Sequence, residues 1–273
     1  MSASPPVTVA VLNQKGGVGK TTVTLGLTSA ARAAGDRVLV VDADPQGSAT
    51  WSLGAPTDDP DHDLGRVLDA NRNGAAGPAV VPSAWGPLVD VIPAGPTLAA
   101  REHDHARRHP EQRLRRALTG VEGYRFVLVD CPPSLGLTTT TALTAADLAL
   151  LVVEPGAYAN RGVAAVLDLI DEVWDRHNRA LDIGGVIVNR LPARSHEADA
   201  RVDELAGIVG RRAVWQPPVP QRVIVNEALG EGRPIHDYRS RARDLIEAFD
   251  RLYARLRRAA GRARSADRNE DRP

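Results

Sequence analysis

The only two lysines of the chain lie five positions apart in one glycine-rich stretch. Residues 13–22 read Asn-Gln-Lys-Gly-Gly-Val-Gly-Lys-Thr-Thr, and the other 32 of the 34 basic residues are arginines. Lysine carries a compact ammonium group on a flexible stem, which reaches and turns where the planar guanidinium of arginine does not. Because the chain uses arginine elsewhere, the pattern indicates that Lys15 and Lys20 take part in chemistry.

The residue types of this stretch, called the phosphate loop below, suit the phosphates of a nucleotide. The glycines allow backbone amides to close around phosphate oxygens, and a helix that begins near Lys20 adds the positive end of its dipole. Lys20 can reach the outer phosphates, and Thr21 can ligate Mg²⁺. We therefore expect an ATP site with Mg²⁺, built from Lys15, Gly16, Gly17, Val18, Gly19, Lys20, Thr21 and Thr22.

Two other interpretations of the phosphate loop explain less. A turn that merely connects a strand to a helix leaves both lysines without a purpose. A dinucleotide-binding loop would have an acidic residue about twenty positions on, where Asp42 stands. Its third glycine, however, would fall at Thr22, and Lys20 and Thr21 would be unexplained. The mononucleotide interpretation is favoured.

The elements around the phosphate loop alternate between apolar strands and helices. Helices are expected over 21–34, 162–174, 197–209 and 241–258, and strands over 7–12, 37–41, 126–129, 148–153 and 186–188. This alternation predicts an α/β fold of the P-loop type, a mostly parallel twisted sheet with helices on both faces. Ligands bind at the carboxyl ends of such strands, where Asp42, Asp130 and Asn189 stand.

The pattern predicts one domain over residues 7–260. Residues 56–96 are rich in Gly, Pro, Asp and Asn and are expected to decorate the core, with an exposed loop at 71–78 and edge strands at 79–81 and 88–92. The ends, 1–6 and 261–273, are polar and are expected to be disordered.

Composition excludes several classes of protein. The formal charge is zero, so no overall field draws the chain to nucleic acid or membrane. A single cysteine, Cys131, rules out an intrachain disulfide or a cysteine zinc site, fits a reducing cytoplasm, and is expected to be a small buried residue. Since no leader and no apolar run of about 18 residues is seen, neither export nor membrane spanning is expected.

Four separated segments resemble the ParA-type partition ATPases, which belong to the deviant Walker A family. They read KGGVGKTT, VDADPQGSAT, VLVDCPPSLG and VPQRVIVNEALGEGRPIHDY, and the likeness runs from Val7 to about Tyr238. Gln14 replaces the first glycine of an ordinary P-loop, and Lys15 stands one place later. The resemblance implies that Lys15 enters the site of a second subunit, so that two copies sandwich ATP. A solvated loop lysine is the alternative.

The same resemblance assigns further residues. Asp44 would position the water that attacks ATP, although it could also cap a helix that begins near Gln46. Asp130 matches the Walker B carboxylate that holds Mg²⁺ directly or through water. The residues expected to border adenine are Asn189, Val219, Pro220 and Gln221. The implied enzyme is an ATPase that is slow without a partner.

Charge is unevenly distributed along the chain. Residues 211–273 hold 15 arginines against nine acidic residues, and the rest carries a matching acidic excess. Such a segment can bind phosphate backbones without reading sequence, although a solvated helix face gives the same count. Gln221 and Ile224 stand where many ParA proteins have arginine, so that contact is lost or moves to Arg222. The candidate DNA contacts are Arg211, Arg212, Arg222, Arg233, Arg239, Arg241 and Arg243.

Taken together, the resemblance implies a Mg-ATP-dependent homodimer that binds non-specific duplex DNA on the nucleoid in the cytoplasm. A ParB-like centromere-binding protein would stimulate hydrolysis and so segregate a plasmid or chromosome. Because the chain begins directly with its first strand, it resembles the short class without an N-terminal helix-turn-helix.

Three rival interpretations are weaker. A MinD-like membrane-associated ATPase would end in an amphipathic membrane helix, whereas the last dozen residues here are polar. No membrane partner is therefore expected. A nitrogenase-type reductase needs cluster-binding cysteines that the chain lacks. Glu102, His103, Asp104, His105 and His109 could suggest a metal site, but helical spacing brings only His105 and His109 to one face, which favours a solvated helix.

Overall fold

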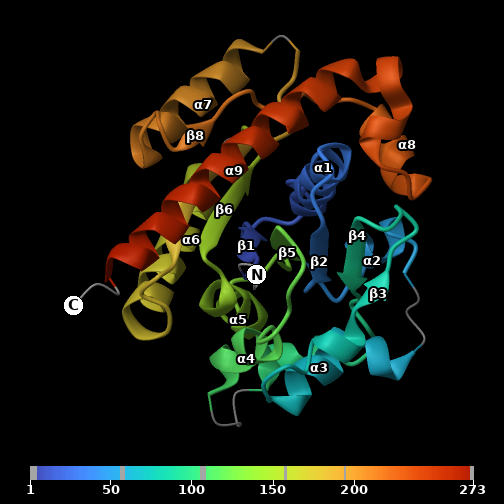
Figure 1. Ribbon diagram of the computed structural model, residues 1–273. Coiled ribbons are helices and arrows are strands. Elements are labelled where there is room, and N and C mark those ends of the chain that lie inside the picture. Colours follow the sequence, from blue (N-terminus) through green and yellow to red (C-terminus); the bar gives the residue numbers. More distant parts are fainter. Residues whose placement is uncertain (1–4, 56–58, 105–108, 157–158, 194, 271–273) are drawn as a thin grey trace.

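The computed structural model describes residues 5–55, 59–104, 109–156, 159–193 and 195–270. Its central sheet has eight strands in the order β3-β4-β2-β5-β1-β6-β7-β8, and neighbours run parallel except β3, which is antiparallel to β4. Figure 1 shows this sheet with helices around it, which confirms the predicted α/β class. The strands are β1 (Val7–Leu12), β2 (Val38–Asp42), β3 (Val81–Pro82), β4 (Val89–Ile92), β5 (Phe126–Asp130), β6 (Leu148–Val153), β7 (Asp182–Val188) and β8 (Val214–Trp215).

Helices cover both faces of the sheet. α1, α8 and α9 contribute to the core on one face, whereas α3 to α7 contribute to the core on the other (Figure 1). The helices are α1 (Lys20–Ala33), α2 (Ser48–Ser52), α3 (Leu64–Ala70), α4 (Arg113–Ala117), α5 (Leu137–Ala145), α6 (Ala159–Arg176), α7 (His196–Val209), α8 (Ile224–Gly230) and α9 (Arg243–Glu270).

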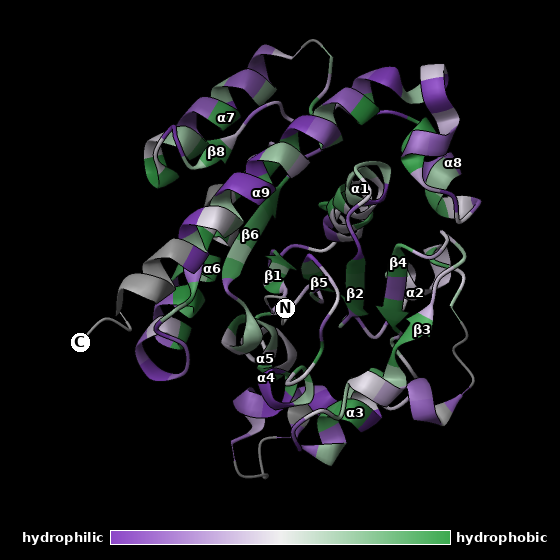
Figure 2. Ribbon diagram, in the orientation of Figure 1, coloured by the Kyte–Doolittle hydropathy of each residue, from purple (hydrophilic) through white to green (hydrophobic). Residues whose placement is uncertain are grey.

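The central strands are apolar because both of their sides are buried. All six residues of β1 are buried, and successive side chains alternate between the two cores: Val9 and Val11 enter one, and Ala10 and Leu12 enter the other. Figure 2 shows the central strands as hydrophobic, whereas α9 alternates between hydrophilic and hydrophobic residues. The expected apolar stripe of α9 packs into the core through Leu245, Phe249, Leu252, Tyr253 and Leu256.

The C-terminal helix is longer than the sequence suggested. We expected a helix over 241–258 followed by a disordered tail from residue 261, but α9 continues to Glu270. Ala259 and Ala260 are buried and hold this part of the helix against the core. Alanine and arginine favour helix strongly, and the single Gly261 costs only about 1 kcal/mol. Of the other predicted end, 1–6, residues 1–4 lie outside the described part.

The segment 59–96 is more than decoration. Its predicted edge strands exist, although the first begins at Val81, and β4 pairs with β2 in parallel register. The predicted exposed loop at 71–78 is partly wrong. Ala75 and Ala76 are buried, and the amide of Ala76 bonds to the carbonyl of Ala117. Small apolar residues of this segment pack against α4, a contact that its glycine-rich composition did not predict.

The contact between α1 and α9 gives a test of this packing. A Cβ atom at Gly26 would lie 2.1 Å from the buried Phe249 ring, whereas one at Gly207 of α7 meets no atom within 4 Å. Gly26→Ala should therefore lower the free energy of unfolding by about 1–3 kcal/mol through overpacking. Gly207→Ala makes the same chemical change in an open helix and should not destabilise. Urea unfolding compares the two, and equal stabilities would contradict the packing.

Candidate nucleotide-binding site

The phosphate loop connects β1, at the centre of the sheet, to the first turn of α1. Asn13 is buried at its start: its Nδ2 donates to the carbonyl of Val152 at 2.6 Å, and its Oδ1 accepts from the Lys15 amide at 2.9 Å. Gly17 and Gly19 have φ angles of 81° and 88°, the left-handed region that favours glycine. The loop is thus held in place by β6 at one end and turned by glycines before α1.

Lys20 lies inside this turn rather than on the surface. Its side chain is buried, and Nζ lies 3.4 Å from the carbonyl oxygen of Lys15. Burial lowers the pKa of the Lys20 ammonium, while the nearby charge of Asp130 opposes that change. An anion placed against the loop would compensate for the burial of this cation.

Thr21 and Asp130 meet beneath the loop. The Thr21 hydroxyl donates to Asp130 Oδ2 at 2.7 Å, and the Thr24 hydroxyl donates to Oδ1 at 3.1 Å. Asp130 ends β5 opposite Asp42, which ends β2, and both carboxyls are fully buried. Asp42 accepts from the amide and the hydroxyl of Thr50, both at 2.7 Å. A hydroxyl next to a carboxylate is the donor set of a Mg²⁺ site.

Burial raises the pKa of both acids. It raises the pKa of Asp42 to about 6, against the opposing hydrogen bonds from Thr50. It raises the pKa of Asp130 to about 7, and the charge of Asp42 adds to this effect. Two close carboxyls in one buried site resist double ionisation, so the nucleotide-free protein favours a proton there.

The raised pKa values predict a pH dependence of stability. Between about pH 4 and 7 the folded protein holds protons on Asp42 and Asp130 that the unfolded chain has released, so folding binds protons. The free energy of unfolding of the nucleotide-free protein should therefore fall as the pH rises from about 5 to about 7, as measured by urea unfolding.

His236, whose Nε2 lies 3.0 Å from Asp250, supplies the control variant for this experiment, because its ion pair lies outside the carboxyl pair. The variant His236→Gln should keep the decline. A free energy of unfolding that rises with pH in that variant would contradict the assignment to the carboxyl pair.

Asp44 follows β2 and stands at the wall of the site. Its Oδ1 accepts from the amide of Gln46 at 2.9 Å, and its carbonyl accepts from the amide of Gly47 at 2.9 Å. We expected that Asp44 could cap a helix that begins near Gln46. Instead, Asp44 begins a turn, and α2 starts at Ser48 with Gly47 at its N-cap position. The turn fixes the carboxylate while leaving it partly exposed.

These residues surround an open pocket of about 630 Å³. Of the sequence-predicted residues, Lys15 and Val18 are outside its lining, and Asp130 lies beneath Thr21. The sequence pattern did not point to Trp51, whose side chain is 61% exposed, or to Arg190, which lies 3.7 Å from Glu154. The predicted residues in the lining are Gly16, Gly17, Gly19, Lys20, Thr21, Thr22 and Asp44, and those not predicted include Gln46, Ser48, Trp51, Pro133, Arg190 and Leu229.

A second pocket, of about 560 Å³, shares Thr22 and Arg190 with the first. The predicted adenine-edge residues Asn189, Pro220 and Gln221 line it, whereas Val219 is buried beside them. Asn189 Nδ2 donates to the carbonyl of Val18 at 2.7 Å, which ties β7 to the phosphate loop. Arg190 directly follows Asn189 after the end of β7, and this position in the sequence could have indicated that Arg190 lines the site.

Four of the seven predicted DNA-contact arginines form ion pairs with acids. Arg222 lies 2.6 Å from Asp244, Arg241 lies 2.8 Å from Glu227, Arg233 lies 3.3 Å from Glu231 and Arg211 lies 3.7 Å from Asp203. In the described part of the chain, Arg212, Arg239 and Arg243 have no such partner. The seven are spread between the α7–β8 turn and the segment that runs from Arg222, just before α8, to the start of α9.

Two other predicted features can be placed. No group of metal-binding side chains is found among the described residues, and His105 of the suspected cluster lies outside them. Glu102 instead accepts from the Ser134 hydroxyl at 2.8 Å and from the Thr138 amide at the start of α5. Within the described ranges, none of the helices is both long and apolar enough to span a bilayer.

Comparison with known proteins identifies the family. A family model described as an AAA domain matches residues 7–183. The sporulation initiation inhibitor protein Soj of Bacillus subtilis is 37% identical over 86% of this chain and 92% of its own length. The chromosome partitioning protein ParA of Caulobacter vibrioides is 35% identical over 94% of this chain and 95% of its own. The chain belongs to the ParA family of P-loop ATPases.

Solved structures share the fold of this chain. The ATP complex of a Cyanothece McdA variant has a TM-score of 0.83 over 94% of this chain and 97% of its own, at 20% identity, and so shows the shared fold. Cobyrinic acid a,c-diamide synthase from Mycobacterium smegmatis, solved with ADP and magnesium, is 32% identical with a TM-score of 0.71 over 83% of this chain and 91% of its own.

Proposed function

We propose that this chain is a DNA-partition ATPase. Two copies close over Mg-ATP, the closed dimer holds duplex DNA without sequence preference, and hydrolysis separates the subunits and releases the DNA. A ParB-like centromere-binding partner stimulates this otherwise slow hydrolysis, so that a plasmid or chromosome is segregated across the nucleoid. The observation that carries the proposal is the exposed Lys15 beside a formed phosphate pocket, in a chain of the ParA family.

The residues of the first pocket fit Mg-ATP. Glycine amides and the start of α1 face the site of an anion, and Lys20 supplies a buried positive charge. Thr21 and Asp130, 2.7 Å apart, would hold Mg²⁺, which neutralises charge on the outer phosphates when bound. The second pocket adjoins the first through Thr22 and Arg190, and we place the adenine there, bordered by Asn189, Val219, Pro220 and Gln221.

Asp44 is the residue we assign to the attacking water. Its carboxylate is the acid that lines the first pocket, and the Asp44–Gly47 turn holds it still. Positioning is most of what phosphoryl transfer requires, because little covalent chemistry falls to the protein. A single carboxylate that orients water, with no further group supplied by a partner, is consistent with slow basal turnover.

Lys15 is the residue we assign to the second subunit. Its backbone amide is fixed by Asn13, whereas its side chain is exposed and outside the lining of its own pocket. Within the described residues no carboxylate lies within 4 Å of its ammonium. A fixed backbone with a free ammonium at the rim of a phosphate site is suited to reach phosphates held by another copy.

The role of Lys15 predicts a specific defect. Lys15→Ala should bind ATP as a monomer but fail to form the ATP-dependent dimer, because the cross-subunit charge contact is lost. Light scattering with saturating Mg-ATP measures the mass, and Gln14→Ala, which truncates the exposed neighbouring side chain, is the matched control. An ATP-dependent dimer of Lys15→Ala would show that the lysine is a solvated loop residue.

A further inference from the structure

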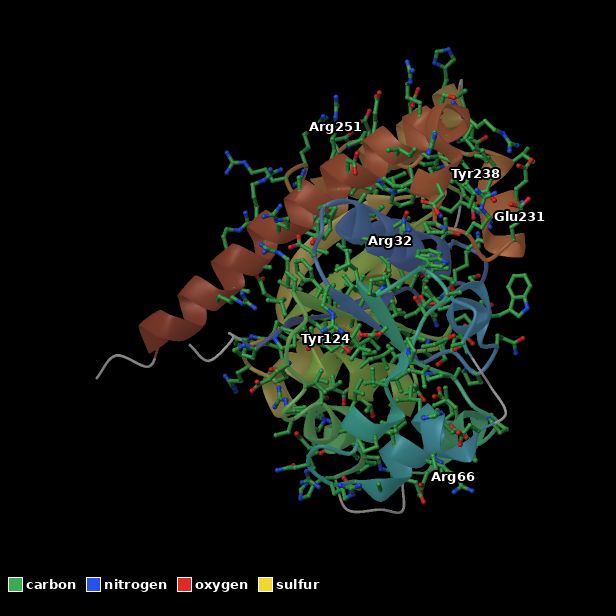
Figure 3. All side chains as sticks on the ribbon, turned by 45° about the vertical axis from the view of Figure 1, so that its right-hand side comes forward. Arg32, Arg66, Tyr124, Glu231, Tyr238 and Arg251 are labelled. Atoms are coloured by element: carbon green, nitrogen blue, oxygen red, sulfur yellow. The ribbon has the colours of Figure 1, made fainter. Side chains whose placement is uncertain are left out.

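Four of the arginines of α9, from the middle of the helix onward, stand at helical spacing. Arg251, Arg255, Arg258 and Arg262 are separated by four, three and four residues, which places them on one side of the helix. The buried face of α9 is formed by other residues, among them Leu252 and Leu256. Figure 3 shows Arg251 extending from α9 away from the body of the protein. We call these four residues the arginine stripe.

The arginine stripe differs from four of the seven predicted DNA contacts in having no carboxylate in ion-pair contact. Among the side chains that the structure describes, which end at Arg264, none of its four guanidinium groups lies within 4 Å of a carboxylate, whereas Arg211, Arg222, Arg233 and Arg241 each have one. Burial lowers the pKa of Arg255, and the charges of Arg258 and Arg262 add to that effect. The stripe is therefore a row of like charges in which only Arg251 has an acid, Glu247, at helical spacing.

The helix dipole does not account for the arginine stripe. Cations near a helix C-terminus are stabilised by the dipole, but the effect is confined to the last turn. α9 ends at Glu270, about two turns beyond Arg262 and about five beyond Arg251. Like charges three or four residues apart otherwise destabilise the helix by a few tenths of a kcal/mol each. Binding of a polyanion would offset the repulsion between these arginines, which explains why they stand in one row.

The middle of the stripe is fixed by β8 and the turn before it. The Arg255 guanidinium lies 5.4 Å from the centre of the buried Trp215 ring and donates to the carbonyl of Arg212. This contact brings the stripe next to the exposed Arg211 and Arg212, in the region where Figure 1 shows α9 running beside β8. A guanidinium already held in place loses little entropy when it binds a ligand.

We propose that the arginine stripe is the principal contact of this chain with the phosphates of duplex DNA, and that the acid-paired arginines contribute little. This rests on the proposed function. The stripe spans about 11 residue steps, or about 16 Å of helix, which matches about five phosphates of one DNA strand at about 3.4 Å each. Guanidinium groups bind phosphate through paired hydrogen bonds. A lipid surface fits less well, because the apolar face of α9 is buried against the sheet.

Two variants with the same loss of charge test this proposal. The stripe variant is Arg251→Ala, Arg258→Ala and Arg262→Ala, which leaves Arg255 on Trp215. The control variant is Arg222→Ala, Arg233→Ala and Arg241→Ala. Both are made in the Asp44→Ala background with Mg-ATP, and binding to a duplex of random sequence, about 40 base pairs long, is measured from about 50 to about 200 mM salt. Light scattering and thermal unfolding check that both variants fold and dimerise.

The stripe variant should bind DNA at least about tenfold more weakly, with the slope of log affinity against log salt reduced by about 3 for each subunit in contact. The control variant should change by less than about threefold. Equal losses of DNA affinity in the two variants would mean that binding depends only on net charge. A loss of affinity confined to the control variant would mean that the acid-paired arginines make the DNA contact. Either result overturns the proposal but leaves the proposed function standing.

Two further outcomes test the proposed function separately from the role of the arginine stripe. If the Asp44→Ala protein with all of its arginines fails to bind duplex DNA with ATP, the DNA-carrier function fails. If it then sediments with phosphatidylglycerol vesicles and the stripe variant does not, the stripe recognises a lipid surface instead.

Discussion

Lys20→Ala should abolish the thermal stabilisation that Mg-ATP gives the parent protein. Lys20 is buried in the turn between the phosphate loop and α1, and the charge of Asp130 offsets its burial only in part, so a bound anion would supply the rest. A ligand at about a hundred times its Kd stabilises by about 2.7 kcal/mol, which corresponds to roughly 5–10 °C in Tm for a chain of this size. Differential scanning fluorimetry with and without Mg-ATP measures the loss.

Lys15→Ala is the matched control for this prediction, because it removes the other lysine of the same loop. It should keep the part of the stabilisation that comes from binding ATP as a monomer. Retention of the full shift by Lys20→Ala would mean that the pocket we describe is not where the phosphates bind.

Asp44→Ala should bind ATP and dimerise but hydrolyse ATP at least about a hundredfold more slowly. The substitution removes the carboxylate at the pocket wall and leaves Lys20, Thr21 and Asp130 in place. Loss of a group needed only in the transition state lowers kcat without weakening substrate binding. Phosphate release, with nucleotide affinity measured in parallel, tests this prediction.

Asp44→Asn distinguishes charge from structure. An asparagine oxygen can still accept from the amide of Gln46, so the turn is kept while the negative charge is lost. Asp44→Asn should be as slow as Asp44→Ala. Normal hydrolysis by Asp44→Asn would show that the turn, and not the carboxylate, is what matters.

The phosphate loop and the sheet could be predicted because their signals are local. Glycine and lysine at fixed spacing mark the loop, and continuous apolar runs mark strands that are buried on both faces. The meeting of Asp42 and Asp130 follows from the same pattern, since the carboxyl ends of parallel strands share one edge. Short elements such as α2 and the two-residue β8 lack enough residues to show a period.

What could not be predicted depends on contacts between distant residues. Arg222 and Asp244 are 22 positions apart, and Arg241 and Glu227 are 14 apart, so a count of charges could not reveal which arginines are paired with acids. The four-three-four spacing of the arginine stripe was visible in the sequence. It became informative only when α9 proved to continue past Gly261 and, in the described part of the chain, no carboxylate was found in ion-pair contact with the stripe.

The central claim is that ATP, by joining two copies, turns the protein into a DNA carrier. The most direct measurement is the affinity of the Asp44→Ala protein for random-sequence duplex DNA with Mg-ATP and with Mg-ADP, across a salt series, beside the Lys15→Ala protein with Mg-ATP. The account predicts binding at least about tenfold tighter with ATP than with ADP, a steep loss with salt, and weak binding by Lys15→Ala. Equal affinity with the two nucleotides, or affinity independent of salt, would contradict it.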